Sequence, residues 1–383
     1  MRRVCIIQRT LPHYRIALFQ GLYEKLLETG IELTVIYGQN AEKEVPVTVQ
    51  IDRAWAKSRP NLYLSGDQKG LVWQRCLSDL RGYDLIIIEY AGRLLLNYVL
   101  LGLRALRVFK LAFWGHGRNF QAERADSVKE NVKRHLLGQV DWWFAYTDLS
   151  KSTIVEANFS DEKVTVLNNT IDDTVLRAQF EKVRSKMLPN AHAPFLESTD
   201  NIAVYCGGIY EEKKIPFLID ACIAIRERLP DFQFYWIGSG PDEYLVRNAT
   251  ANLEWMHYVG PLFNEEKLKY FARAKLHLMP GLVGLTIIDS FITEVPIITT
   301  RDAKHSPEIA YLVSDENGVI TGNELRDFVD KVIFYMRDDM ALEKLRQGCR
   351  EASRILTLEN MISNFAQGIA KALEQPTLKR KQS

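Results

Sequence analysis

The feature that most constrains the fold of this chain is a regular alternation of short apolar runs with longer helix-like segments. Apolar runs of strand length separated by helices are typical of parallel sheets, in which right-handed crossovers join successive strands. The alternation stops near residue 173 and starts again at residue 201. The runs that we expect to form strands are residues 3–8, 32–37, 83–89, 111–114 and 142–145 in the first half, and 202–206, 233–237, 276–279 and 296–299 in the second.

The restart divides the chain into two predicted domains. A length of 383 residues supports this division, because one domain usually contains about 100 to 200 residues. We expect Rossmann-like α/β domains at residues 1–175 and 201–355, joined by a charge-rich connection at residues 176–200. Residues 356–373 carry apolar side chains at helical spacing, so we expect an amphipathic helix that packs back on the first domain.

The overall charge argues against one class of function. The 49 Lys and Arg against 48 Asp and Glu leave a net charge of +1, which gives no field that favours nucleic acid. The five cysteines form no Cys-x-x-Cys pair and lie in apolar runs, as reduced and buried thiols do. No apolar segment reaches the roughly 18 residues that span a bilayer. We therefore expect a cytoplasmic protein that does not bind nucleic acid.

A glycine turn follows the first strand of the second half. Gly207 and Gly208 come directly after the strand, and Lys213 precedes a helical run at residues 216–228. Free backbone N–H groups at a helix start, together with an ammonium, form a typical phosphate site. The segment matches neither the P-loop nor the Gly-x-Gly-x-x-Gly spacing, so, taken alone, it is better explained as a plain turn with a solvated lysine.

Two more turns are expected at the carboxyl edge of the same sheet, where open α/β folds bind ligands. The first contains Gly238 and Gly240. The second contains Gly281, Gly284 and Leu285 and leads into a predicted helix that includes Asp289. The Asp289 carboxylate can accept hydrogen bonds from both hydroxyls of a ribose. The three turns together predict a nucleotide site.

In this order the motifs resemble glycosyltransferase family 4, a family of retaining enzymes with the GT-B fold of two Rossmann-like domains facing across a cleft. Lys213 matches the lysine of the family, whereas Gly208 stands at the position of its arginine. The two acidic residues of the family, separated by seven others, fall on Gly281 and Asp289. Glu308 matches a later glutamate, which implies contact with the donor or its diphosphate; a loop that caps the next helix is the alternative.

The first half resembles the same family. Residues 114–117 resemble its His-Gly motif, and residues 166–172 resemble its Asn-x-x-Asp motif. The resemblance implies that His116 donates a hydrogen bond to the donor sugar, although a histidine that merely packs beside a tryptophan is the alternative. The opening loop replaces a glycine pair and is expected to line the acceptor side. Its residues are Pro12, His13, Tyr14 and Arg15.

Arg15 has a second possible task. It could supply the positive charge that the family's arginine would bring at position 208, where this chain has Gly208. The alternative is an arginine at a helix start in water.

The resemblance implies transfer of a sugar from a UDP or GDP sugar, with retention, to a glycan or lipid-linked acceptor of a cell-surface polysaccharide pathway. It implies no cofactor and no metal, and the chain has no Asp-x-Asp motif that would hold one. Lys213 would meet the charge of the departing diphosphate. No carboxylate stands out as the nucleophile of a two-step route. The resemblance implies front-face attack within one step instead.

Residues 93–118 are basic and apolar without a single acid. Such a segment can form an amphipathic helix on an anionic membrane. A crossover helix with one solvated basic face explains the pattern equally well. The cations are Arg93, Arg104, Arg107, Lys110 and Arg118.

Three other functions are alternatives to the transferase. A GT-B protein that binds a nucleotide sugar without transferring it is suggested by Gly208 and Gly281. A nucleotide-sugar epimerase could have the same fold. A nicotinamide-dependent oxidoreductase is disfavoured, because the first strand runs into residues 9–12 without a glycine fingerprint.

Overall fold

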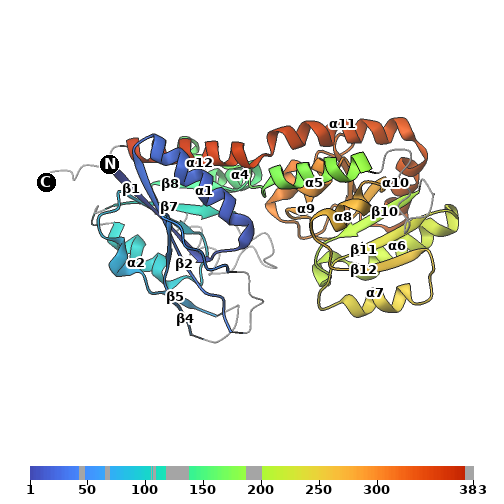
Figure 1. Ribbon diagram of the computed structural model, residues 1–383, viewed down its shortest axis with the longest axis horizontal. Coiled ribbons are helices and arrows are strands. Elements are labelled where there is room, and N and C mark those ends of the chain that lie inside the picture. The colour runs from blue at the N-terminus through green and yellow to red at the C-terminus, as the bar shows by residue number, and fades with distance from the viewer. Residues whose placement is uncertain are drawn as a thin grey trace. The chain divides into compact units, whose positions relative to one another are not determined.

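The computed structural model describes residues 1–42, 48–64, 70–104, 106, 109–117, 138–186 and 201–375. The chain divides into two compact units (Figure 1). The first unit contains Met1–Ile171 together with Leu358–Ser383, and the second contains Asp172–Thr357. Each unit is an α/β structure built on its own sheet.

The described residues of the first unit form a seven-stranded sheet in the order β3-β2-β1-β6-β7-β8-β9. Every neighbouring pair is parallel. A separate antiparallel pair joins β4 to β5. The strands are β1 (Arg2–Thr10), β2 (Ile31–Gly38), β3 (Ala56–Ser58), β4 (Asn61–Tyr63), β5 (Val72–Gln74), β6 (Leu85–Glu89), β7 (Lys110–Gly115), β8 (Trp142–Ala145) and β9 (Val164–Val166).

Helices cover both faces of this sheet, because alternate residues of each buried strand point to opposite sides. In β1, Val4 and Ile6 join the core under α1 (Ile16–Glu28) and α12 (Leu358–Glu374). Cys5 and Ile7 join the opposite core under α2 (Leu95–Arg104) and α4 (Asp148–Glu156). Both β1 faces are therefore apolar.

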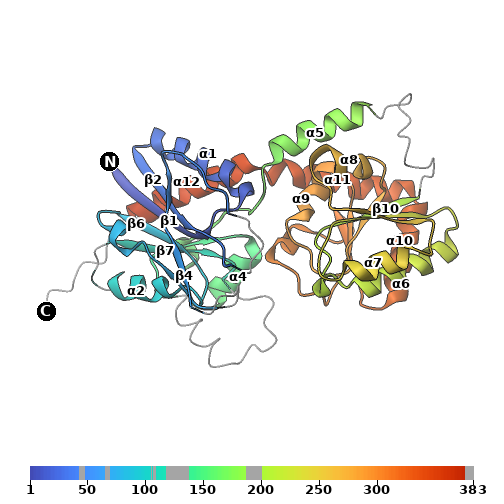
Figure 2. The same ribbon diagram turned by 60° about the horizontal axis from the view of Figure 1, so that its bottom comes forward.

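The helix α12 lies beside α1 on the first unit, although the chain reaches it from the second (Figure 2). Its Phe365 ring lies 5.1 Å from that of Trp114 and 4.7 Å from that of Phe144. The Lys110 ammonium donates to the carbonyls of Ala372, at 3.0 Å, and of Leu373, at 2.7 Å. Lys110 thus satisfies carbonyl groups at the helix end, where a cation is favourable.

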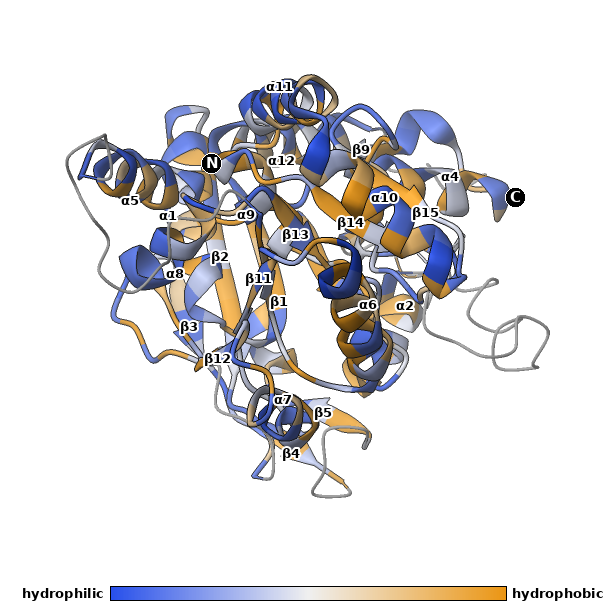
Figure 3. Ribbon diagram, turned by 90° about the vertical axis from the view of Figure 1, so that its right-hand side faces the viewer, coloured by the Kyte–Doolittle hydropathy of each residue, from blue (hydrophilic) through white to orange (hydrophobic). Residues whose placement is uncertain are grey.

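The described residues of the second unit form a six-stranded parallel sheet in the order β12-β11-β10-β13-β14-β15. The chain order changes direction at β10, which lies between β11 and β13. Figure 3 shows hydrophobic residues gathered along the strands. The strands are β10 (Ile202–Cys206), β11 (Gln233–Ile237), β12 (Met256–Gly260), β13 (Leu276–Leu278), β14 (Ile297–Thr300) and β15 (Gly318–Thr321).

The helices of the second unit also lie in two groups. The helices α6 and α10 pack together, and α5 packs against both α8 and α9. Residues 173–186, most of which we expected in the connection, form α5 of this unit, and residues 187–200 lie outside the described residues. The helices are α5 (Asp173–Lys186), α6 (Ile215–Arg228), α7 (Glu243–Thr250), α8 (Asn264–Phe271), α9 (Thr286–Thr293), α10 (Leu325–Arg337) and α11 (Asp339–Ile355).

The close contact of α12 with the sheet predicts that Gly368→Ala destabilises the protein. A Cβ at this position would lie 2.5 Å from Thr165 Oγ1 and 2.7 Å from Phe144 Cε1. Such overpacking costs about 1 to 3 kcal/mol in the free energy of unfolding, measured by urea denaturation. Gly102→Ala is the matched control, because no atom lies within 4 Å of its added Cβ in α2. Loss of stability in the control alone would contradict this packing.

Candidate functional site

The carboxyl edge of the second sheet is built from turns whose backbones touch. A Cβ on Gly238 would lie 1.9 Å from the Gly207 carbonyl oxygen, and one on Gly240 would lie 2.1 Å from that of Ile209. Gly207 and Gly238 also have φ angles of +159° and +143°, which side chains rarely adopt. These glycines are therefore required by the fold, at the edge where open α/β sheets bind ligands.

Lys213 lies in this edge, in the turn between β10 and α6. Its side chain is buried, and its Nζ donates to the Leu282 carbonyl at 2.6 Å and lies 3.7 Å from Met279 Sδ. Burial lowers the pKa of the ammonium to about 8, against the opposing effects of Cys206 and Glu212. Among the described residues no carboxylate forms an ion pair with Lys213. The ammonium therefore keeps bonding capacity for an anion, and a fully solvated lysine is excluded.

Gly281 connects the turn after β13 to the turn that carries Lys213. A Cβ on Gly281 would lie 2.3 Å from the Glu212 carbonyl oxygen and from the Lys213 carbonyl carbon. The next residue, Leu282, donates its N–H to the same Glu212 carbonyl at 2.8 Å. A glutamate at position 281 would not fit without moving one of the turns. A contact between two backbones thus occupies the place where the resemblance led us to look for an acid.

Gly208 is also covered by a neighbour. A Cβ here would lie 2.7 Å from Tyr210 Cε1, and the Tyr205 hydroxyl donates to the Gly208 carbonyl. The Tyr210 ring centroid lies 5.5 Å from the Lys213 ammonium. The Tyr210 ring therefore occupies the space that an arginine side chain at position 208 would enter.

Asp289 lies in α9 and is already engaged by a residue that the sequence did not single out. Its Oδ2 lies 2.8 Å from the ammonium of Lys267 in α8, and both side chains are mostly buried. The other oxygen, Oδ1, is buried without a partner. A lysine in the run Glu265-Glu266-Lys267 looks like a solvated residue, so only the three-dimensional structure, in which α8 and α9 both pack on α5, reveals the pair. Asp289 keeps one oxygen for a further donor.

The remaining donor-side predictions fall on neighbouring turns. Gly284 and Leu285 precede α9, where Thr286 Oγ1 donates to the Cys206 carbonyl at 3.2 Å. Glu308 is buried in the short helical turn Pro307–Tyr311. His305, three residues before Glu308, contacts backbone with both ring nitrogens, at Val283 and at Thr300.

Arg15 is buried in the first unit. Its Nη2 donates to Asn169 Oδ1 at 2.8 Å, and its guanidinium lies over the rings of Trp114, at 5.1 Å, and Tyr146, at 5.8 Å. Nη1 is buried without a partner. An arginine at a helix start in water is therefore excluded. Asn169 belongs to the Asn-x-x-Asp motif noted in the sequence, so the two predicted motifs meet here.

His116 follows β7 and is exposed, with its ring 4.4 Å from that of Tyr146. Partial desolvation of the ring, and then the charge of Arg15, lower the pKa of the imidazole. In the opening loop Pro12 is half-buried, while His13 and Tyr14 are exposed.

Sequence reasoning missed Glu89, which ends β6 at the carboxyl edge of the first sheet. Burial raises the pKa of its carboxyl, while Arg9, Arg93 and Arg15 act in the opposite direction. Its Oε1 accepts the Arg9 backbone N–H at 3.3 Å. The signal available in the sequence was an acid directly after three isoleucines.

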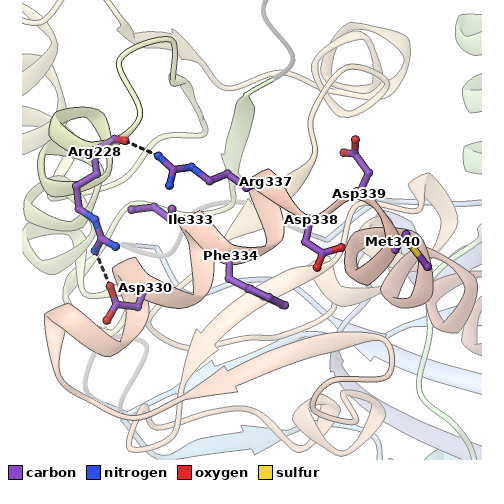
Figure 4. Close-up of a pocket in the computed structure, with 8 residues that line it drawn as sticks. All are labelled: Arg228, Asp330, Ile333, Phe334, Arg337, Asp338, Asp339 and Met340. Carbon is purple, nitrogen blue, oxygen red and sulfur yellow. Dashed lines mark hydrogen bonds and ion pairs between the residues drawn. The ribbon is translucent and has the colours of Figure 1, made fainter.

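A surface hollow of about 570 Å³ lies elsewhere on the second unit (Figure 4). It lies where α6 and α10 end and α11 begins, and Arg337 Nη2 donates to the Arg228 carbonyl there at 2.9 Å. In a parallel α/β unit helices end at the amino edge of the sheet. The hollow is therefore distinct from the carboxyl edge that holds Lys213.

Two cations of the predicted membrane segment are used inside the protein. Arg104 forms a two-point ion pair with Asp141, at 2.7 and 2.9 Å, and Lys110 contacts the end of α12. Arg107 and Arg118 lie outside the described residues. Within the described part of the chain, the helices are too short or too polar to cross a membrane.

Comparison with known proteins decides the type of domain. Residues 200–338 match the family model described as Glycosyl transferases group 1. The chain has the GT-B fold and carries a group 1 glycosyltransferase domain. The predictions of this fold and of a glycosyltransferase are therefore confirmed, whereas membership of family 4 and retention stay predictions.

Solved structures resemble the glycosyltransferase over nearly its whole length. Anabaena HepE in complex with UDP has a TM-score of 0.66 at 14% identity, covering 97% of this chain and 100% of its own. Sucrose-phosphate synthase from Thermosynechococcus elongatus has a TM-score of 0.70 at 14% identity, covering 97% of this chain and 99% of its own. The lipopolysaccharide outer core galactosyltransferase WaaB has a TM-score of 0.65 at 13% identity, covering 96% of this chain and 99% of its own. No curated protein matches the chain by sequence.

The environment of Lys213 predicts an unusual titration. In the ligand-free glycosyltransferase its amine should titrate near pH 8, whereas an exposed lysine titrates near about 10.4. Acylation with a trace of acetic anhydride at pH 6 to 11, read by peptide mass spectrometry, measures each midpoint. The exposed Lys344 is the internal control. Coinciding midpoints for the two lysines would show that Lys213 is solvated.

Proposed function

We propose that this glycosyltransferase moves a sugar, with retention, from a nucleotide diphosphate sugar to a glycan or lipid-linked acceptor of a cell-surface polysaccharide pathway. One observation carries the proposal: a buried ammonium, Lys213, without a carboxylate partner in the described residues, at the carboxyl edge beside β10. The binding of UDP by the structural neighbour HepE supports UDP as the nucleotide, and GDP is the alternative.

The chemistry needs positive charge where the diphosphate leaves. Cleavage of the bond between the sugar and the diphosphate places about two negative charges on the departing oxygens, and preorganised donors there stabilise the transition state. Lys213 is held for this task by the Leu282 carbonyl, and the backbone N–H groups at the start of α9, after Gly284, add dipoles. We propose that these groups suffice without a resident metal.

The nucleoside is expected at Asp289. Because Lys267 engages Oδ2, the oxygen left for a ribose hydroxyl is Oδ1. We expect one strong hydrogen bond to ribose rather than two, and small side-chain movements must open Oδ1 to it. Glu308 is proposed to contact the donor or its diphosphate from the neighbouring turn.

The first unit is proposed to present the acceptor. His116 donates to the donor sugar, and Pro12, His13 and Tyr14 line the acceptor side. Arg15 has an unpaired, buried Nη1 that is suited to an anion, either of the donor diphosphate or of the acceptor. Front-face attack remains the proposed route. We also propose peripheral contact with a membrane. Arg104 and Lys110 would not take part, because both are engaged inside the protein.

Lys213→Ala should lower kcat/KM by a factor that corresponds to about 2 to 4 kcal/mol, because one preorganised donor to the leaving group is lost. Transfer and hydrolysis are measured by mass spectrometry with a panel of UDP and GDP sugars, and circular dichroism checks folding. Lys344→Ala serves as the control. A wild-type protein that binds nucleotide sugar without turnover would be a binding protein, and release of an epimerised nucleotide sugar would identify an epimerase.

Asp289→Asn should weaken binding of UDP or GDP by roughly tenfold, because an amide oxygen accepts a hydrogen bond more weakly than a carboxylate. Lys267 would also lose its counter-charge. Calorimetry measures the dissociation constant, and Asp220→Asn on the exposed side of α6 is the matched control. Equal affinity in both variants would remove Asp289 from the nucleotide site.

A further inference from the structure

His305 lies between the end of β14 and the turn that follows β13. Its Nδ1 accepts the Val283 backbone N–H at 3.1 Å, and its Nε2 donates to the Thr300 carbonyl at 2.8 Å. The adjacent Ser306 N–H donates to the Val283 carbonyl at 3.1 Å. Because one ring nitrogen accepts and the other donates, the imidazole is neutral and in a single tautomer. Neither nitrogen is free to contact a ligand.

The turn that His305 holds is residues 280–284, which we call the Gly281 turn. It provides the carbonyl of Leu282 to Lys213. The Pro280 carbonyl accepts a hydrogen bond from the Thr300 hydroxyl at 2.7 Å. The Gly281 carbonyl accepts one from the Thr299 hydroxyl at 3.3 Å. The turn is thus joined on one side to Lys213 and on the other to the end of β14.

The Gly281 turn has no room for a side chain at Gly281 itself. A Cβ there would lie 2.3 Å from the Glu212 carbonyl oxygen, whereas a Cβ on Gly284 would make an ordinary contact, 3.4 Å from Ser306 Oγ. The position of the turn is therefore set by backbone hydrogen bonds to fixed partners. One of these hydrogen bonds runs from the Val283 N–H to His305, and its acceptor is a side chain that can become protonated.

We propose that His305 is a positioning residue of the donor site, which holds the Gly281 turn against Lys213 only while its imidazole is neutral. This inference rests on the proposed function of Lys213 as a diphosphate ligand. A protonated ring cannot accept the Val283 N–H, so acid detaches the turn and leaves the Lys213 ammonium without its fixed carbonyl. Substitution of His305 should affect nucleotide binding although the ring touches no nucleotide.

The surroundings of the ring favour the neutral form. Burial lowers the pKa of His305, and the ammonium groups of Lys214 and Lys213 lower it further, whereas the bond to the Thr300 carbonyl acts the other way. The contact with Val283 is therefore intact at and above the ordinary histidine pKa. Its stabilising contribution is lost as the pH falls through the lowered value.

Two variants separate the two ring contacts. In His305→Asn the amide oxygen can take the place of Nδ1 and accept the Val283 N–H. In His305→Gln the amide reaches the place of Nε2 and keeps only the Thr300 contact. His257→Asn is the control, because that ring contacts Gln233, at 3.0 Å, away from the Gly281 turn.

Two measurements are made on each variant. Hydrogen exchange of residues 280–285, followed by mass spectrometry without ligand at pH 5 to 8, reports the turn itself. Calorimetry with UDP and GDP reports the nucleotide site. We expect His305→Gln to exchange faster and to bind about tenfold more weakly, and His305→Asn to stay within about threefold of wild type. Protonation of the nucleotide's own terminal phosphate weakens binding in acid for every variant, and wild type and the control should lose more affinity in acid than His305→Asn does.

Unchanged hydrogen exchange of residues 280–285 in His305→Gln would show that His305 does not hold the Gly281 turn. Faster exchange with unchanged nucleotide affinity would show that holding the turn does not matter for the donor site. Equal losses in the Asn and Gln variants would also contradict it, because Asn keeps the Val283 contact whereas Gln keeps only the Thr300 contact. If the wild-type protein binds neither UDP nor GDP, the proposed function fails, and the role of His305 in a donor site fails with it.

Discussion

The second unit depends on one contact, between the turn that carries Lys213 and the turn at Gly281. Burying an ammonium is costly unless hydrogen bonds compensate, and here the Leu282 carbonyl provides one at 2.6 Å. The contact requires a residue without Cβ at position 281. The cation is thereby fixed before any ligand arrives, which reduces the reorganisation that binding would demand.

The central strands could be predicted from the sequence because they are buried on both faces and read as unbroken apolar runs. The edge strands of the second sheet could not be predicted in this way. In β12 (Met256–Gly260) only the first residue is fully buried, and β15 (Gly318–Thr321) begins with glycine and ends with threonine. Neither shows the unbroken apolar run of the central strands, and their pairing depends on neighbours far away in the sequence.

The residues of the candidate site differ in the same way: some could be predicted from their neighbours in the sequence, and others could not. Lys213 was predictable because a strand, a glycine turn and a helix surround it in the chain. Lys267 and Glu89 were not, because their significance comes from partners on other elements: Asp289 for the first and Arg9 for the second. Gly208 and Gly281 looked like losses of side chains, whereas a tyrosine ring and a backbone occupy the space.

The place of α12 affects the order in which the protein can assemble during translation. The second unit is one continuous segment, Asp172–Thr357, whereas the first needs Leu358 and the residues beyond it. Domains usually fold as they leave the ribosome, the amino-terminal one first. Here the face of the amino-terminal sheet at Trp114 and Phe144 stays partly uncovered until Phe365 emerges. The later unit can therefore be complete earlier. Chaperones that bind apolar surfaces would find their target on the first 171 residues.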